Sequence, residues 1–265
     1  MTIKEYVAQR KLELKEEISH LEIKPHIQII QINDDPASNA YVKGKLKDAA
    51  EMGIEADLLK LPELGTTPEI LQEIIESSNN DPRIDGFIVQ MPLPKGFDEE
   101  AVKLAISPKK DVDGFHPLSS LNPCTPQGIM NYLHAEHINL CGKNALVIGR
   151  SNIVGKPMAK LLLKENCNVT IVHSKTTKED MARYIANADI IVVAIGKMHF
   201  LNENFKYKED AIIVDVGISR DETGLHGDAV PNLPVKLQTP VPGGVGLLTR
   251  LALMENLLTI YRDNH

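Results

Sequence analysis

Short apolar runs rich in β-branched residues alternate with segments of helical periodicity along almost the whole chain. This alternation is typical of βαβ units and of mostly parallel sheets. The first part of the chain predicts strands at 26–32, 56–59 and 84–89, and helices at about 38–52, at 67–79 and after residue 98. The second part predicts strands at 145–148, 168–172, 190–194 and 211–214, and helices at about 155–165, 177–186 and 247–261.

A proline-rich stretch without periodicity, residues 107–126, separates the two series. Such a stretch is a natural domain boundary. We therefore expect an α/β protein of two domains, residues 1–118 and 119–246, each a mostly parallel sheet with helices on both faces. The final helix, within 247–265, is expected to pack back on the first domain, although its spacing alone does not establish this.

Composition narrows the class of partner. The formal net charge of the 265 residues is −7, and no dense run of Lys or Arg offers a basic face, which argues against nucleic acid. The three cysteines form no C-x-x-C pair and are typical of free thiols in a reducing compartment. The charged first 20 residues do not resemble a signal peptide, and no apolar run approaches the length of a membrane span. We expect a cytoplasmic protein.

The second predicted domain opens with a glycine-rich turn between a strand and a helix. Gly149, Arg150, Ser151 and Gly155 occupy this turn. Such turns bring backbone amides and a helix N-terminus to a ligand phosphate, as in dinucleotide-binding domains. The spacing departs from G-x-G-x-x-G, because Ser151 replaces the second glycine and the last glycine lies one position late. A tight turn that binds nothing remains an alternative.

The end of the next strand indicates which dinucleotide would bind. NAD-specific domains usually carry an acid there, whereas this strand ends in His173, Ser174 and Lys175. A hydroxyl and cations suit a 2′-phosphate, and Arg150 could reach the same place, so we predict NADP. Singly, His173 or Lys175 could also be part of a solvated loop. Further candidates for the cofactor site follow later strands, with simple turns as the alternative: Gly196, Gly217 and Ile218.

A helix in the first domain carries the candidate catalytic groups. Its predicted cap is Ser38 or Asn39, and its predicted buried stripe is Val42, Leu46, Ala49 and Ala50. Tyr41 and Lys45 lie four residues apart and share a face beside that stripe, where they could line one wall of a pocket. By periodicity alone, Lys45 would be a surface lysine.

Two other segments change this interpretation of Lys45. A buried strand ends at Gln90 and continues into a proline-rich turn, and Asp111 and Asp113 lie in the loop before the domain boundary. The ordered motifs Y-V-x-x-K, V-Q-M-P-L-P, K-D-V-D-G, G-R-S-x-x-V-G-x-P and P-V-P-G-G-V-G resemble those of the bifunctional methylenetetrahydrofolate dehydrogenase/cyclohydrolase family.

The resemblance implies a Rossmann-type second domain, an active-site cleft between the domains, a homodimer, and a role in one-carbon metabolism that includes purine biosynthesis. It implies that Lys45 is the catalytic lysine, that Gln90 positions it, that Tyr41 stacks on folate and that Asp113 binds the pterin. The loop Pro242, Gly243, Gly244 and Val245 would close over folate and nicotinamide. Arg150, Ser151 and Ser174 would contact NADP.

Alternatives remain open at this point. One is a monofunctional NAD(P)-dependent folate dehydrogenase, and another is a non-catalytic dinucleotide-binding regulator. The chain also departs from the family's G-P-M-T, because Leu247 and Leu248 stand where Pro and Met are usual. His134 and His137 lack a third ligand and are better interpreted as a polar helix face than as a metal site.

Overall fold

The computed structural model describes all residues from Met1 to His265. Its helices are α1 (Ile3–Ser19), α2 (Pro36–Met52), α3 (Pro68–Asn80), α4 (Glu99–Ala105), α5 (Cys124–Ala135), α6 (Gly155–Lys164), α7 (Lys178–Asn187) and α8 (Val245–Asn264). Its strands are β1 (His26–Gln31), β2 (Glu55–Lys60), β3 (Gly86–Val89), β4 (Asn144–Ile148), β5 (Asn168–Val172), β6 (Ile190–Val193), β7 (Ile212–Asp215), β8 (Ser219–Asp221), β9 (Gly224–His226) and β10 (Leu237–Gln238). The predicted helices and strands are all present.

The chain forms two compact units, and each is assembled from two separate segments. Unit 1 comprises Met1–Val7 and Thr125–Thr249, and unit 2 comprises Ala8–Cys124 and Arg250–His265. No helix in either unit is both long enough and apolar enough to cross a bilayer.

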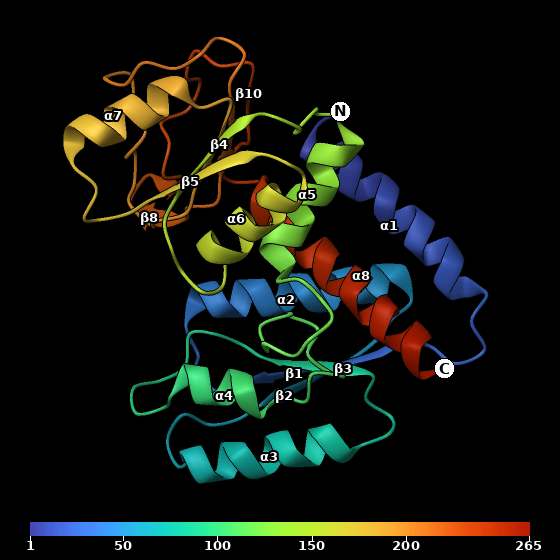
Figure 1. Ribbon diagram of the computed structural model, residues 1–265. Helices are drawn as coiled ribbons and strands as arrows, with labels where there is room; N and C mark the ends of the chain where they lie inside the picture. The colour runs from blue at the N-terminus through green and yellow to red at the C-terminus, as the bar shows by residue number, and fades with distance from the viewer. The chain divides into compact units, whose positions relative to one another are not determined.

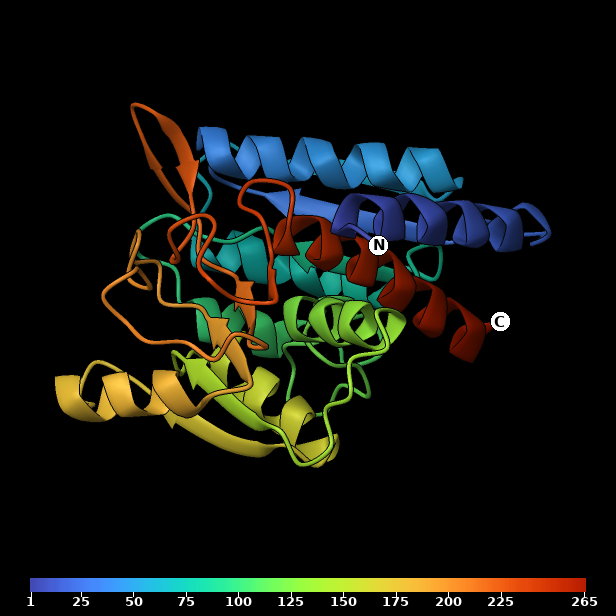
Figure 2. The ribbon, with the colours of Figure 1, turned by 90° about the horizontal axis from the view of Figure 1, so that it is seen from above.

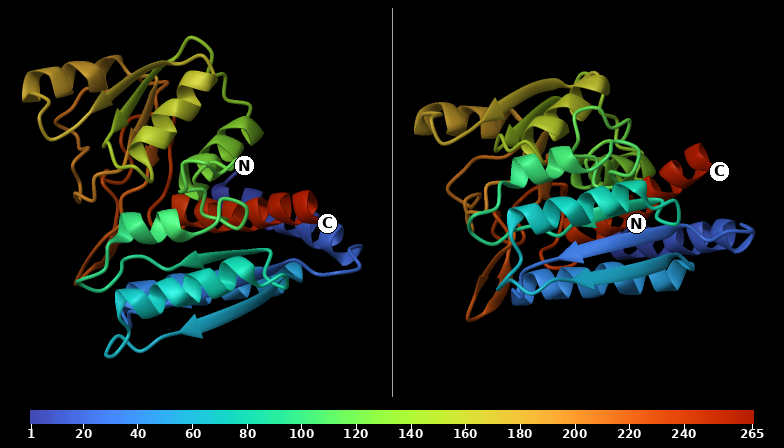
Figure 3. Two further views of the ribbon diagram at one scale, coloured as in Figure 1. Left: turned by 60° about the horizontal axis from the view of Figure 1, so that its bottom comes forward. Right: turned by 90° about the horizontal axis from the view of Figure 1, so that it is seen from below.

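Unit 2 is built on a three-stranded parallel sheet in the order β2-β1-β3. Helices α3 and α4 cover one face, where Leu71 and Val102 pack against Ile30 and Phe87. Figure 3 shows these two helices together, and Figure 1 shows α2 on the opposite face of the sheet from α3. Because all three strands run in parallel, the ends of β1 and β3 meet at one edge of the sheet, beside α2.

Unit 1 is built on a five-stranded parallel sheet in the order β10-β7-β6-β4-β5. Residues of α5 and α6 pack on one face, and residues of α7 pack on the other. From β4 the chain passes first to β5, on one side of β4, and then to β6, on the opposite side. This reversal is the topological switch point at which open α/β sheets bind ligands. The unpredicted β8–β9 hairpin stands apart from this sheet (Figure 2).

Helix α2 begins and packs differently from its prediction. Its N-cap is Asp35, whose side chain accepts a hydrogen bond from the Ser38 N–H, so neither Ser38 nor Asn39 caps it. Pro36 supplies the first helical residue, where its missing N–H costs nothing. Ala50 is exposed and Leu46 only half-buried, so this part of the predicted stripe is wrong. The buried face instead contains polar side chains, including Lys45 and Asp48.

Candidate active site

Lys45 lies in the buried face of α2, in unit 2. Only 8% of the residue is exposed, although its helical position alone predicts a surface lysine. Its Nζ donates a hydrogen bond to Gln90 Oε1 at 3.0 Å. Gln90 directly follows β3, and its own Nε2 donates to the Met91 carbonyl oxygen at 2.6 Å. The second bond orients the amide, so that its oxygen faces the lysine.

The surroundings of Lys45 favour the neutral amine. Burial removes water from the ammonium group and lowers the Lys45 pKa, while Asp113 opposes this shift. The positive charge of Arg250 adds to the lowering. The hydrogen-bond partner of Lys45 is an amide, which does not fix the ammonium form as a carboxylate would. A lysine in this setting can exchange protons nearer to neutral pH than an exposed one.

Tyr41 precedes Lys45 by one helical turn and is half-buried. Burial raises the pKa of its phenol, so the hydroxyl remains protonated and the ring offers an apolar surface with a polar tip. The structure therefore places Tyr41, Lys45 and Gln90 in one unit, with Lys45 and Gln90 in direct contact. Lys43 and Lys47 are exposed on the opposite side of α2.

Asp113 lies in the loop between α4 and α5. Burial raises the pKa of its carboxyl group, and the charges of Lys45 and Lys103 act against this shift. The neighbouring Asp111 is 1% exposed and accepts hydrogen bonds from the N–H groups of Gly114 at 3.1 Å and His116 at 2.7 Å. Asp111 thereby holds the turn in which Asp113 sits.

Helix α8 holds the same loop from outside. Asn256 is 5% exposed, and its Nδ2 donates to the carbonyl oxygens of Val112 at 2.9 Å and Asn122 at 3.3 Å. It also lies 3.5 Å from Cys124 Sγ, and burial raises the pKa of this thiol well above its usual value. A protonated buried thiol that donates to the Val112 carbonyl is part of the loop's packing and is no nucleophile.

Arg250 brings a second cation to α2. Its Nε lies 2.8 Å from Asp48 Oδ2 as an ion pair, although the N–H is not aligned for a hydrogen bond. Its guanidinium occupies the space beside Gly44, because a Cβ at that position would lie 2.1 Å from Arg250 Nη1. Gly44 therefore allows a guanidinium to approach the helix next to Lys45. Sequence reasoning missed Arg250, Asp48 and Asn256, and only the glycine inside a helix could have indicated this approach.

The glycine-rich turn in unit 1 lies at the switch point of its sheet. Gly149 follows β4 with a φ of +122°, and a Cβ there would lie 2.5 Å from the Ala194 carbonyl oxygen. A Cβ on Gly155 would lie 2.4 Å from the Gly149 carbonyl oxygen, so α6 approaches the end of β4 closely. Ser151 Oγ accepts hydrogen bonds from the N–H groups of Val154 and Gly155, both at 3.2 Å, and thus holds the turn that leads into α6.

The other predicted cofactor residues also follow the carboxyl ends of strands in this sheet. Arg150 and Ser174 are exposed, and His173 is half-buried with its Nδ1 accepting from the Lys175 N–H at 3.2 Å. No acid occupies positions 173–175 after β5. Gly196 follows β6, and the buried Gly217 and exposed Ile218 follow β7. This donor set fits a phosphorylated dinucleotide: a glycine turn, a helix N-terminus and a strand end with a hydroxyl and a cation.

The segment Pro242–Val245 forms a tight turn immediately before and at the start of α8. A Cβ on Gly244 would lie 2.1 Å from the Pro240 carbonyl oxygen, and Gly243 has a φ of +88°. Both positions therefore require glycine. The turn belongs to unit 1, so Pro242, Gly243, Gly244 and Val245 lie in the same unit as the glycine-rich turn at Gly149.

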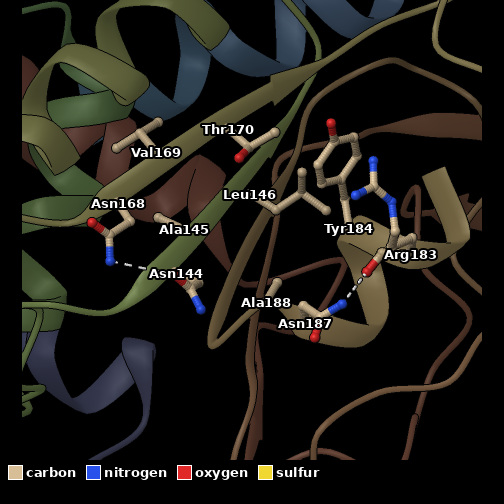
Figure 4. Close-up of a pocket in the computed structure, with 10 residues that line it drawn as sticks. All are labelled: Asn144, Ala145, Leu146, Asn168, Val169, Thr170, Arg183, Tyr184, Asn187 and Ala188. Carbon is tan, nitrogen blue, oxygen red and sulfur yellow. Dashed lines mark hydrogen bonds between the residues drawn. The ribbon is translucent and has the colours of Figure 1, made fainter. Parts of the chain in front are cut away.

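Other candidates do not form sites. His137 lies beyond the end of α5 with a φ of +53°, so the predicted helix face shared with His134 is wrong. His134 Nε2 lies 3.3 Å from Glu165. No group of three or more metal-ligating side chains is arranged around a common point. A hollow of about 510 Å³ lies between the amino ends of β4 and β5 and helix α7 (Figure 4), away from the strand ends described above.

Two family models together account for nearly the whole chain. Residues 1–113 match the tetrahydrofolate dehydrogenase/cyclohydrolase catalytic domain, and residues 123–265 match the NAD(P)-binding domain of the same family. The chain belongs to the tetrahydrofolate dehydrogenase/cyclohydrolase family. It is a bifunctional enzyme with dehydrogenase and cyclohydrolase activities on tetrahydrofolate derivatives.

Individual relatives agree with the family models. The chain is 47% identical to the bifunctional protein FolD of Streptococcus pneumoniae over 94% of this chain and 90% of that protein. It is 45% identical to the Enterococcus faecalis protein over 95% of this chain and 94% of the relative.

Solved structures give the same result. The bifunctional FolD enzyme of Campylobacter jejuni matches with a TM-score of 0.94 and 39% identity over 99% of this chain and 98% of that one. The Trypanosoma brucei enzyme, solved with NADP and an inhibitor, matches with a TM-score of 0.93 and 30% identity over 99% and 97% of the two chains. The family suspected from the sequence motifs is confirmed.

Proposed function

We propose that this chain oxidises 5,10-methylenetetrahydrofolate with NADP and hydrolyses the 5,10-methenyl product to 10-formyltetrahydrofolate, and that Lys45 serves the hydrolysis. The contact between the buried Lys45 Nζ and Gln90 Oε1, at 3.0 Å, is the observation that carries this assignment. Proton exchange near neutrality needs a lysine that burial has made less basic, and an amide partner leaves it free to do so.

The oxidation step depends on orientation. The cofactor supplies the hydride acceptor, and the protein needs neither a metal nor a nucleophile for the transfer. Tyr41 offers a ring on which the aromatic portion of folate can stack, and the turn Pro242–Val245 is the loop assigned to folate and nicotinamide. These residues act by holding the two reactants in a reactive geometry, which is a large contribution to any bimolecular step.

The hydrolysis step depends on proton transfer. A water molecule adds to the methenyl cation, and a nearby group must accept a proton from it. Lys45 takes this role because burial lowers its pKa, and Gln90 keeps its Nζ in place. Asp113 binds the pterin, because an ionised carboxylate accepts hydrogen bonds from the donor-rich edge of that ring. The proximity of its charge to Lys45 also moderates the lowering of the lysine pKa.

The preference for NADP rests on the end of β5. Ser174 and Lys175 stand where an NAD-specific domain carries an acid, and Arg150 is exposed on the turn after the neighbouring strand β4. A hydroxyl and two cations favour a 2′-phosphate, whereas a carboxylate would repel it. The Trypanosoma brucei relative has been solved with NADP. We assign Gly149, Ser151 and Gly155 to the phosphates and Gly196, Gly217 and Ile218 to the far half of the cofactor.

The remaining assignments concern the setting of the enzyme. We assign the folate domain to residues 1–118 with the final helix, 247–265, and the NADP domain to residues 119–246. We also propose a homodimer, because β5 is an edge strand with unpaired backbone groups on one side. Three free cysteines suit the cytoplasm, and 10-formyltetrahydrofolate would supply one-carbon metabolism, including purine biosynthesis.

A spectrophotometric assay with methylenetetrahydrofolate, run separately with NADP and NAD, tests the reaction. We expect NADPH to appear first and the methenyl absorbance to decay afterwards. Reduction without that decay would indicate a monofunctional dehydrogenase. Reduction of neither cofactor would favour the non-catalytic regulator.

The role of Lys45 has a matched control on the same helix. Lys47 is exposed and its nearest carboxylate is Glu51, at 3.6 Å. We expect Lys45→Met to abolish the hydrolysis of methenyltetrahydrofolate while the fold is kept, and Lys47→Met to leave it unchanged. Full hydrolysis by the Lys45→Met enzyme would refute the assignment.

A further inference from the structure

Two carboxylates are buried in unit 1 and have no role in the chemistry described so far. Asp215 is 2% exposed and Asp228 is 0% exposed. All of the hydrogen bonds that their carboxylate oxygens accept come from backbone N–H groups. Burying a charge is costly unless it is fully hydrogen-bonded, so such an arrangement needs a structural or functional reason.

Asp215 fixes the segment that carries Asp228. It is the last residue of β7, and its Oδ1 accepts from the N–H groups of Gly217 at 3.0 Å and Asp228 at 2.9 Å. Its Oδ2 accepts from the Ala229 N–H at 2.8 Å. The Asp215 N–H donates to Thr239 Oγ1 at 2.8 Å, which ties the arrangement to the residue after β10.

Asp228 fixes the turn that follows β6. Its Oδ2 accepts from the N–H groups of Ile195 at 2.7 Å and Gly196 at 3.1 Å, and its Oδ1 accepts from Lys197 N–H at 2.6 Å. Three consecutive N–H groups that converge on one anion form a backbone nest. Here the protein's own carboxylate occupies the nest, and it holds Gly196 at a φ of +61°.

Two glycines make this arrangement possible. A Cβ on Gly217 would lie 2.1 Å from Asp228 Cγ, and a Cβ on Gly227 would lie 2.0 Å from Asp215 Oδ2. Each carboxylate therefore fills the space beside a glycine that flanks the other aspartate. We call this set, Asp215, Gly217, Gly227 and Asp228, the aspartate interlock.

The interlock lies at the carboxyl ends of β6 and β7, the part of the sheet edge that the nicotinamide half of the cofactor must reach. With the 2′-phosphate after β5 and the pyrophosphate at the turn after β4, the sheet order β5-β4-β6-β7 leaves the ends of β6 and β7 for the other half. The interlock joins the turns after these two strands. The first of them, 195–197, follows Ala194, whose carbonyl oxygen closely faces Gly149.

From this placement, which rests on the proposed function, we infer that Asp228, anchored by Asp215, is a positioning residue for the dehydrogenase step. Its carboxylate sets the shape of the 195–197 turn against which the nicotinamide half of NADP binds. The hydrolysis step uses no hydride acceptor, and its assigned residues, Lys45 and Gln90, belong to unit 2. Loss of the Asp228 charge should therefore impair the dehydrogenase and spare the cyclohydrolase.

The test compares NADP affinity with hydrolysis in the same full-length variants. Asp228→Asn keeps the shape but places an amide N–H₂ against backbone N–H donors, and we expect its Kd for NADP to rise roughly ten- to hundredfold. The rate of methenyltetrahydrofolate hydrolysis without cofactor should stay within about twofold of the unsubstituted enzyme. In Asp228→Ala, added formate should restore part of the NADP affinity, because it can occupy the emptied nest.

Unchanged NADP affinity in Asp228→Asn would overturn the inference. Equal losses of NADP binding and hydrolysis, with no effect of formate, would overturn it as well, because they would indicate a general structural role. If the Asp228 variants do not fold, Thr239→Val is tested instead, because it removes the acceptor for the Asp215 N–H. We expect a smaller loss that is confined to NADP affinity. No loss, or equal losses of NADP affinity and hydrolysis, would refute the inference. An unsubstituted enzyme that binds no NADP would refute the proposed function itself.

Discussion

Asn256 offers a quantitative test of how the pterin-binding loop is held. The substitution Asn256→Ala removes the Nδ2 donor that bonds the carbonyl oxygens of Val112 at 2.9 Å and Asn122 at 3.3 Å. Both bonds belong to a side chain that is 5% exposed, so water does not readily replace them. The substitution also empties part of the space between α8 and the loop that carries Asp113.

The expected magnitude follows from these two bonds. Each net hydrogen bond stabilises a protein by roughly 1–1.5 kcal/mol, so their loss costs about 2–3 kcal/mol. If the weakened loop opens locally, substrate binding must supply the lost free energy to close it again. Each 1.36 kcal/mol of this free energy corresponds to about a tenfold change in affinity. We therefore expect KM for the folate substrates to rise by roughly 30- to 160-fold, and the free energy of unfolding to fall by no more than about 3 kcal/mol.

Two measurements check this prediction. Guanidinium denaturation reports the free energy of unfolding, and initial rates with methenyltetrahydrofolate report KM and kcat. Thr259→Ala is the matched control, because Thr259 lies on the same helix and its hydroxyl bonds only the Glu255 carbonyl oxygen of that helix, at 3.0 Å. An Asn256→Ala enzyme that matches the control in both stability and KM would refute the reasoning.

Three further predictions concern charge. Because the pKa of Lys45 is lowered in the folded state, the unfolded chain binds more protons between that pKa and 10.5. The free energy of unfolding should therefore rise with pH across this window. In denaturation experiments, Lys45→Met should lack this rise. Burial raises the pKa of Asp111 from 3.8 to about 6, so the free energy of unfolding should fall by roughly 3 kcal/mol as pH rises through this range. Asp111→Asn should lack this fall. The same pH profile in Asp111→Asn and the unsubstituted enzyme would contradict the shift. Ser174→Asp should lower kcat/KM for NADP by roughly tenfold or more while sparing NAD, with Ser174→Ala as control; equal effects on both cofactors would contradict the 2′-phosphate assignment.

Periodicity predicted most strands of the two parallel sheets because the central strands are buried, but it did not predict α1, α5 or β10. The four residues of β6, for example, are all buried, and in the sequence such strands are continuous apolar runs bounded by turn residues. No pattern in the sequence indicated the order of the strands within each sheet, and none predicted the β8–β9 hairpin. Its strands contain Ser219, Arg220 and Asp221, which show no apolar alternation.

The candidate site was less accessible to pattern reasoning. The spacing of Tyr41 and Lys45 gave them a shared face, but burial of Lys45 depends on β3 and on α8, which lie far away in sequence. Only the ordered motifs indicated the contact with Gln90. Asp228 was missed because a single aspartate before a small residue has no local signal, and its partners are backbone groups that no sequence pattern reveals.

The discontinuous make-up of unit 2 has a consequence for biosynthesis. A ribosome delivers residues in order, and unit 2 combines an early segment, Ala8–Cys124, with a late one, Arg250–His265, which is made only after all of unit 1. Until α8 is made, Asp48 lacks its ion pair with Arg250, and the loop around Val112 lacks the Asn256 bond. The first segment of unit 2 should therefore become competent for folate only after α8 has been made, although its residues are among the first to be synthesised.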